Sequence, residues 1–504
     1  MTLGQEAAPR RAGWSRLLEG RAIYLWALTG GLLFHLALAK SVFTLQDRLL
    51  AWILLCLGLE AARSYARQEG SVAPVLPLVM GQLYVLYGLA QFTQTGVFLM
   101  TGPYTPPPRA VTLAMLAVTG AALAFRGAFF WGSRHGHRGA ASLLRTFPEP
   151  KPSWFGGLIV LGVSSAVAGV CLSVWPEAIA PEARNVLHSI LSPYLALVLA
   201  LFFAERWRSL TLAVIGWLLI GTLWLSTFVS SMLEQGVVSL YLLFASRWVW
   251  GRRLRARWLF AAIAGLLLLN PAKYIYRANI RARSEELHSV DAVNRRLGDL
   301  WSQVGDVWRE GVTEENLQVS ANRASALILL AQVIDWVPDH VPYRAGEGLA
   351  DSFLFLIPRA LWNGKPDVSD LVNNAYAVEF QLTTEAGTKQ STIGIWQPID
   401  GYWHFGFTGA IVGLGLYGLI LGWLFGRPGR AALPAILGLY FTAAFFQTLA
   451  SLQNVVASLA TMLIGAWIAL HAVRMLGQMT SPVSSEGMGT RPPAGPASSA
   501  VGRP

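Results

Sequence analysis

The residues of this 504-residue chain that are best suited to chemistry are cations close to long apolar segments. They are Arg277, Arg281, Arg323, Arg359 and Lys365. Arg277 and Arg281 are four residues apart and share one face if their segment is helical. The planar guanidinium group of arginine pairs bidentately with phosphate oxygens. Cations grouped at a membrane boundary therefore indicate a binding site for a pyrophosphate.

Two simpler explanations of these cations stay open. Arg277 and its neighbours can extend their aliphatic stems to reach lipid headgroups. This explanation has the same weight as pyrophosphate binding. Arg359 can form an ion pair with a nearby acid such as Asp351 or Asp367.

Other kinds of chemistry are poorly represented in the sequence. It has no P-loop, no HExxH motif and no GxSxG motif between a strand and a helix. Cys56 and Cys171 lie inside apolar runs and the histidines are scattered, so we expect no disulfide framework, no metal site and no cofactor. Aspartates are absent from most apolar segments, which disfavours a proton-relay pump.

The composition indicates which elements must position the cations. Apolar residues make up 54% of the chain and charged residues 13%, against roughly 25% charged in a typical soluble protein. This is more apolar surface than one water-soluble core can hide, so the predicted fold is an all-α, polytopic membrane protein. The net charge of +11 does not indicate nucleic acid, because the positive charge lies in short loops between apolar runs.

A membrane-spanning helix needs roughly 17–25 mostly apolar residues. Segments of this kind predict twelve spans, near residues 22–39, 47–62, 74–92, 110–130, 154–175, 186–204, 209–230, 234–250, 257–273, 407–426, 432–450 and 455–473.

Lysine and arginine alternate between the short connections as the positive-inside rule requires. Both termini are therefore predicted to be cytoplasmic. The predicted organisation is a cytoplasmic N-terminus (1–21), nine spans (22–273), a large outer loop (274–406), three spans (407–473) and a disordered cytoplasmic tail (474–504).

The outer loop contains two short apolar segments, 323–337 and 346–357. The first places Leu327, Leu330, Ala331 and Ile334 on one helical face. Both segments are too short to span a bilayer, so we expect a lid of amphipathic helices lying on the membrane or dipping into it. A solvated cap without chemistry is the alternative.

The order of motifs between positions 323 and 426 is distinctive. A helix that begins at Arg323 is followed by VPDHVPYRAGEG (337–348), FLIPRALWNGKP (355–366), a polar segment (383–394) and GYWHFGFTGAIVGLGLYGLILG (401–422). This order resembles that of the bacterial O-antigen and exopolysaccharide repeat-unit polymerases of the Wzy type. The resemblance covers residues 323–426 closely and the rest of the chain only as a hydropathy profile.

The resemblance implies metal-independent glycosyl transfer at the periplasmic face of the bacterial inner membrane. A growing glycan would move from undecaprenyl diphosphate onto another lipid-linked repeat unit. The diphosphate leaves well only if its charge is neutralised, which assigns diphosphate binding to Arg277, Arg281, Arg323, Arg359 and Lys365.

The acceptor hydroxyl needs a general base within reach. His404 is the first candidate, Asp400 beside it the second and Glu347 the third. For His404, an anchoring role among the aromatic residues of the membrane interface is an equal alternative. The expected contacts to the acceptor glycan are Tyr343, Trp362 and Tyr402.

The expected partners are undecaprenyl-diphosphate-linked oligosaccharide, the lipid bilayer, a chain-length-regulating co-polymerase and a flippase, but no nucleic acid. Three alternative functions stay open. An O-antigen ligase or another lipid-sugar glycosyltransferase would share the loop and differ in the acceptor. A transporter or flippase would have charged or broken helices at mid-membrane depth. A scaffold protein would not need the Arg359–Lys365 motif.

Overall fold

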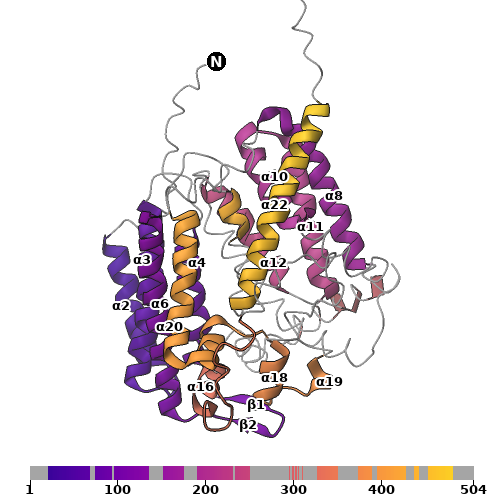
Figure 1. The fold of residues 1–504 in the computed structure, drawn as a ribbon. Coiled ribbons are helices and arrows are strands. Elements are labelled where there is room, and N and C mark those ends of the chain that lie inside the picture. Colours follow the sequence, from indigo (N-terminus) through magenta and orange to yellow (C-terminus); the bar gives the residue numbers. More distant parts are fainter. Residues whose placement is uncertain are drawn as a thin grey trace, which may run out of the picture.

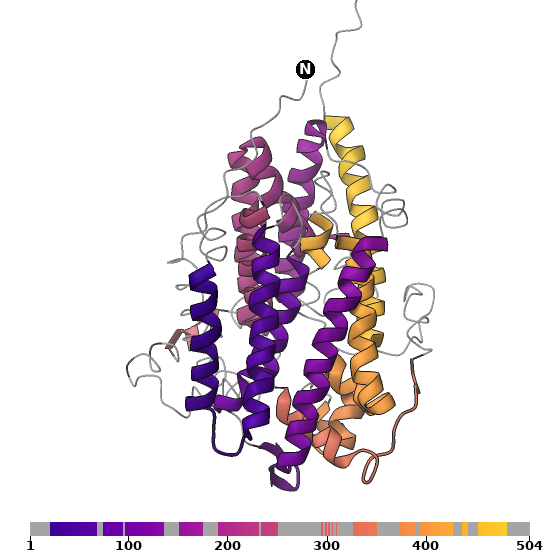
Figure 2. The same ribbon diagram turned by 90° about the vertical axis from the view of Figure 1, so that its left-hand side faces the viewer.

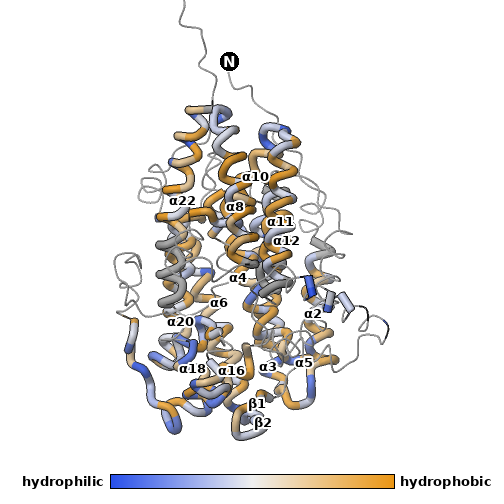
Figure 3. The backbone as a smooth tube through the Cα atoms, turned by 90° about the vertical axis from the view of Figure 1, so that its right-hand side faces the viewer, coloured by the Kyte–Doolittle hydropathy of each residue, from blue (hydrophilic) through white to orange (hydrophobic). Residues whose placement is uncertain are grey.

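The computed structural model describes residues 21–67, 74–93, 96–135, 151–174, 190–230, 233–249, 326–349, 373–388, 394–426, 436–441 and 452–480, with isolated positions between 294 and 309. This part of the chain is mostly helical. Figure 3 shows hydrophobic residues along the long helices. Hydrophilic residues gather around α18, at the end of the molecule that also holds α16 and the two strands.

One group of helices contains most of the N-terminal elements together with α20 (Figure 1). Its members are α2 (Arg21–Leu38), α3 (Leu45–Arg67), α4 (Val75–Leu83), the π-helical turn η1 (Tyr84–Gly88), α5 (Ala90–Thr93), α6 (Pro108–His135), α16 (Leu327–Trp336) and α20 (Gln397–Phe425).

A second group packs around α8 and α11. It contains the 3-10 turn η2 (Pro152–Trp154), α8 (Phe155–Val174), α10 (Pro193–Trp207), α11 (Leu210–Ser230), α12 (Leu233–Val249) and α22 (Leu452–Thr480). Two short helices, α18 (Ala375–Glu379) and α19 (Glu385–Thr388), complete the described elements with the strands β1 (Val97–Leu99) and β2 (Gly102–Tyr104).

Helices lie at most of the predicted spans. Within the described residues, six segments are long and apolar enough to cross a membrane: 75–92, 108–135, 152–172, 210–227, 397–425 and 462–479. The predicted span 257–273 lies outside the described residues, and of 432–450 only 436–441 is described. The chain therefore has the helices of a membrane protein, and the count of twelve spans stays a prediction.

Helices α6 and α20 lie side by side along their length (Figures 1 and 2). The contact depends on glycines of α20 spaced four residues apart. A Cβ atom on Gly418 would overlap the carbonyl oxygen of Phe125, and one on Gly422 would overlap that of Phe129. Small residues at this spacing allow the backbones of membrane helices to approach closely.

Helix α20 reverses direction near its start. Phe405 (φ −140°, ψ 22°) and Gly406 (φ 62°, ψ −148°) are not helical. A Cβ atom on Gly409 would overlap the carbonyl oxygen of Gly401, and one on Gly413 would overlap the side chain of Gln397. These pairs are equidistant from residue 405, so α20 is a hairpin of a short limb (397–404) and an antiparallel long limb (407–425). The predicted boundary at 407 coincides with this reversal, and the short limb lies within the predicted loop (274–406).

Residues 327–336 of the predicted segment 323–337 form a helix, and its position on the membrane or dipping into it stays a prediction. The expectation of a single apolar face does not hold. The described helix, α16, packs against α6, α20 and η1. Ile328 and Gln332 are as fully buried as Leu327 and Leu330 on the predicted apolar face. A helix that is covered on all sides belongs to the protein core. The other predicted lid segment, 346–357, is described only to residue 349, where it forms turns.

The all-α prediction also missed a small sheet. Strands β1 and β2 are antiparallel, with Val97 opposite Tyr104 and Leu99 opposite Gly102. The Tyr104 hydroxyl donates a hydrogen bond to the carboxylate of Asp335 in α16. In the turn between the two strands, the N–H of Met100 donates a hydrogen bond to the carbonyl oxygen of Gln381 over 2.8 Å. The sheet therefore ties the segment before α6 to α16 and to the end of α18.

Candidate active site

The short limb of α20 carries two ionisable side chains that are almost fully buried. Asp400 and His404 lie one helical turn apart, and the Oδ1 atom of Asp400 is 3.5 Å from the Nε2 atom of His404. Their side chains are 3% and 2% exposed. Buried ionisable groups in a membrane protein are costly and are retained mainly where they serve a function.

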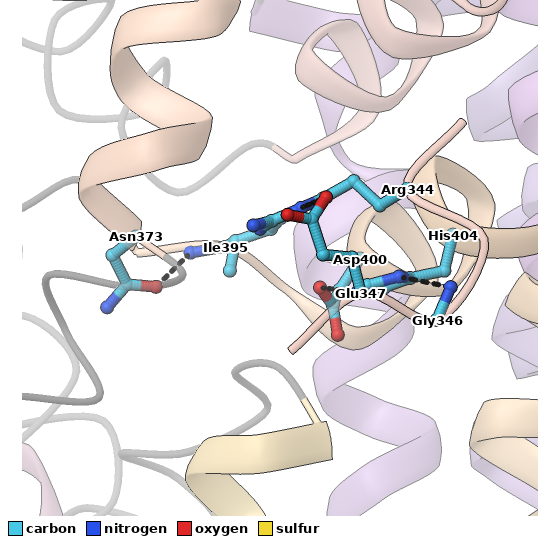
Figure 4. Close-up of polar contacts among 7 residues, drawn as sticks. All are labelled: Arg344, Gly346, Glu347, Asn373, Ile395, Asp400 and His404. Atoms are coloured by element: carbon cyan, nitrogen blue, oxygen red, sulfur yellow. Dashed lines mark hydrogen bonds and ion pairs between the residues drawn. The ribbon is translucent and has the colours of Figure 1, made fainter. Parts of the chain in front are cut away.

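A backbone contact fixes the proton of His404 (Figure 4). The N–H of Gly346 donates a hydrogen bond to Nδ1 of His404 over 3.2 Å. An accepting Nδ1 carries no proton, so the neutral ring carries its proton on Nε2, which faces Asp400. In this state the basic nitrogen of His404 is already occupied, and the carboxylate of Asp400 is the group that can accept a proton.

The segment that contains Gly346, which we call the cover loop (341–349), closes the end of the short limb. The N–H groups of Arg344 and Ala345 donate to the carbonyl oxygens of Trp403 and His404, both over 3.1 Å. These carbonyls end the short limb and have no partner within the helix. The cover loop therefore acts as its C-terminal cap.

The side chain of Arg344 lies at the rim of this site. Its Cζ atom is 4.7 Å from the centroid of the Trp403 ring, a cation–π contact. Its Nε atom is 4.0 Å from a carboxylate oxygen of Glu347, whose side chain is 76% exposed. Glu379, at the end of α18, lies close enough to Arg344 and Glu347 to interact with both charges. Partial burial raises the pKa of the Glu379 carboxyl group, and the negative charge of Glu347 raises it further. The positive charge of Arg344 lowers it.

Aromatic side chains surround the turn of the hairpin. The Tyr402 hydroxyl forms a hydrogen bond with Tyr343 of the cover loop. Tyr402 is buried, whereas Tyr343 and Phe405 are exposed. Deeper in the hairpin, Tyr417 of the long limb interacts electrostatically with Asp400. The carboxyl group of Asp400 therefore lies between His404 and Tyr417 of the long limb.

The start of the short limb is anchored to the segment before α18. The N–H of Ile395 donates to Oδ1 of Asn373 over 3.3 Å (Figure 4). Gln397 and Pro398 then begin the helix, and proline is well suited to this position because it has no N–H group.

Five of the predicted site residues come together in this region: His404, Asp400, Glu347, Tyr343 and Tyr402. The predicted diphosphate-binding residues and Trp362 lie outside the described residues; these are Arg277, Arg281, Arg323, Arg359, Lys365 and Trp362. Among the described residues, no group of three His, Cys, Asp or Glu side chains is placed to hold a metal ion.

Sequence reasoning missed three residues of the site. Arg344 directly precedes the Ala-Gly-Glu-Gly turn, which could have marked it as a fixed cation. Phe405 is the aromatic residue before the glycine of the reversal. Glu379 had no such signal, because only the tertiary fold brings α18 beside the cover loop.

One comparison with known proteins gives a match. A family model described as Domain of unknown function (DUF8712) matches residues 158–456. The matched segment contains the cover loop and both limbs of α20, but not α6. No curated protein and no solved structure matches the chain.

Proposed function

This chain belongs to the DUF8712 family, and we propose that it is a membrane glycosyltransferase that polymerises polysaccharide repeat units. It would transfer the growing glycan from undecaprenyl diphosphate to a lipid-linked repeat unit, at the periplasmic face of a bacterial inner membrane. The observation that carries the proposal is the buried Asp400–His404 pair beneath the arginine-bearing cover loop. This arrangement supplies an oriented proton acceptor inside a group of apolar helices.

In the proposed reaction, the acceptor hydroxyl oxygen bonds to the anomeric carbon of the donor sugar. The bond from that carbon to the diphosphate oxygen breaks, and its electron pair leaves with the diphosphate. The hydroxyl proton passes to the carboxylate of Asp400, whose Oδ1 atom lies 3.5 Å from Nε2 of His404. General base catalysis of this kind contributes typically 10²–10⁴-fold.

The charge of the leaving diphosphate needs cations. The resemblance assigns this role to the five basic residues from Arg277 to Lys365. The proposal keeps that assignment, with no metal ion and no cofactor. The co-polymerase and flippase stay as proposed partners.

A ligase of similar architecture is an alternative that differs only in its acceptor. A transporter or flippase of lipid-linked sugars is the second candidate, and one observation favours it. Helix α20 is broken at residues 405–406 and carries a buried acid, as transporter helices often do at their substrate or ion sites.

Deletion of the gene in its native host separates these functions. Loss of a polymerase leaves single repeat units, free on the lipid or capped, and removes only the long chains. Loss of a ligase leaves long chains on the lipid carrier. Loss of a flippase leaves single units on the cytoplasmic face. An unchanged surface glycan contradicts all three.

Reconstitution then tests the role of Asp400. Lipid-linked units extracted from the deletion strain are mixed with the purified protein in proteoliposomes, and polymer is followed as a ladder on a gel. We expect Asp400→Asn to lower the rate by about 10²- to 10⁴-fold. The matched control is Asp339→Asn, which changes an exposed acid near the cover loop. A normal ladder from Asp400→Asn contradicts the assignment of the base.

A further inference from the structure

We propose that the exposed rings of Tyr343 and Phe405 form a stacking platform for the terminal sugar of the acceptor, and that this sugar is uncharged. This inference rests on the proposed function and names the acceptor subsite of the same site. Among the predicted acceptor contacts Tyr343, Trp362 and Tyr402, it puts the exposed Phe405 in place of the buried Tyr402.

The two rings lie at the junction of the cover loop and the hairpin turn. A Cβ atom on Gly406 would lie 3.3 Å from the Tyr343 hydroxyl, and one on Gly346 would lie 3.1 Å from Cζ of Phe405. Each ring therefore packs on a glycine of the opposite segment. Both glycines have positive φ, 62° for Gly406 and 88° for Gly346, so a side chain at either position is strained as well as crowded.

The platform keeps substantial aromatic surface open. Tyr343 is 41% exposed and Phe405 is 51% exposed. An anchoring role at the membrane interface explains Tyr343, but it explains Phe405 less well, because tyrosine and tryptophan are the residues enriched there. The C–H groups of a pyranose carry partial positive charge and suit the negative face of an aromatic ring.

The position of the platform favours the acceptor over the donor. The ring centroid of Phe405 is 5.8 Å from that of His404, which contacts the proposed base. The acceptor hydroxyl is the group that must reach this base. A sugar stacked on Phe405 would have its hydroxyl groups near the Asp400–His404 pair.

The charged side chains around the platform indicate whether the bound sugar is neutral or acidic. Glu347 and Glu379 offer two carboxylates that accept hydrogen bonds from hydroxyl groups, while Arg344 supplies one cation already facing both. These three side chains carry a net charge of −1 when ionised. They would repel a diphosphate or an acidic sugar and accept a neutral one.

The binding experiment uses the oligosaccharide released by mild acid from the lipid-linked units of the deletion strain. Its affinity is measured for the full-length protein in nanodiscs, and saturation-transfer NMR reports contact with aromatic protons. We expect Phe405→Leu and Tyr343→Leu each to weaken binding by about tenfold, or 1.4 kcal/mol. Phe405→Tyr and Tyr343→Phe keep a ring and should stay within about twofold of the wild type.

The control is Trp217→Leu, which removes an aromatic residue of similar exposure from α11 and should leave binding unchanged. Wild-type affinity in both leucine variants, with polymer formation intact, overturns the platform and leaves the proposed function standing. An acidic sugar at the non-reducing end of the oligosaccharide overturns the charge argument. If the deletion strain accumulates no lipid-linked unit, the proposed function and this inference fail together.

Discussion

Gly401 and Gly409 contact each other through their backbones, and this contact closes the hairpin that carries the buried acid. Neither position has room for a methyl group. We therefore expect Gly409→Ala to destabilise the protein by about 1–3 kcal/mol, the usual cost of overpacking. Gly221→Ala on α11 is the control, because its added Cβ atom meets nothing within 4 Å. The thermal unfolding midpoints of the two detergent-solubilised variants are compared with that of the wild type. Equal midpoints for Gly409→Ala and Gly221→Ala would contradict the antiparallel hairpin.

The orientation of His404 predicts unequal effects of two substitutions. His404→Gln keeps a polar side chain beside the Asp400 carboxylate but cannot act as a base. We expect it to retain polymerisation within about tenfold of the wild-type rate, while Asp400→Asn loses about 10²- to 10⁴-fold. The ladder assay measures both rates. If His404→Gln falls as far as Asp400→Asn, then His404 is the base and must release Gly346 during the reaction.

Hydropathy predicted the helices well, because long apolar runs need only composition to be recognised. It could not predict the reversal at Gly406, since GYWHFGFTGA contains only aromatic and small residues apart from His404 and no proline that would mark a turn. The candidates His404 and Asp400 came from their residue types and from the resemblance. The role of His404 depends on Gly346, which lies 58 residues earlier in the chain, and a contact of that range leaves no periodic signal.

The carboxyl group of Glu379 predicts a pH dependence of stability. Its pKa is raised in the folded protein, chiefly by partial burial. The folded state therefore binds more protons than the unfolded state between the ordinary and the raised pKa, and stability falls as pH rises through that window. We expect Glu379→Gln to remove this part of the slope. Unfolding midpoints measured from about pH 4 to 7 test it, with the exposed Glu385 on α19 changed to glutamine as the matched control.

The orientation of the chain in the membrane is testable at described positions. Glu347 lies in the cover loop and Glu385 begins α19, whereas His135 ends α6. Figure 1 shows α19 at the same end of the molecule as α16 and the two strands, from which α6 runs to the other end. In a background with Cys56 and Cys171 replaced by serine, we expect cysteines at 347 and 385 to react with an impermeant maleimide in intact spheroplasts. A cysteine at 135 should react only after permeabilisation. The reverse pattern would place the site on the cytoplasmic face.

The glycine contacts on both sides of α20 determine which part of the site is able to move. The long limb meets the backbone of α6 on one side and that of the short limb on the other, so the three segments can shift only as one rigid body. Asp400 cannot swing outward to meet a substrate. Access must come from displacement of the cover loop, which is held to the short limb by the hydrogen bonds from Arg344, Ala345 and Gly346. The Tyr343–Tyr402 hydrogen bond and the Arg344–Trp403 contact hold the same loop. At about 0.5–1.5 kcal/mol for each hydrogen bond, its displacement requires all of these contacts to break together.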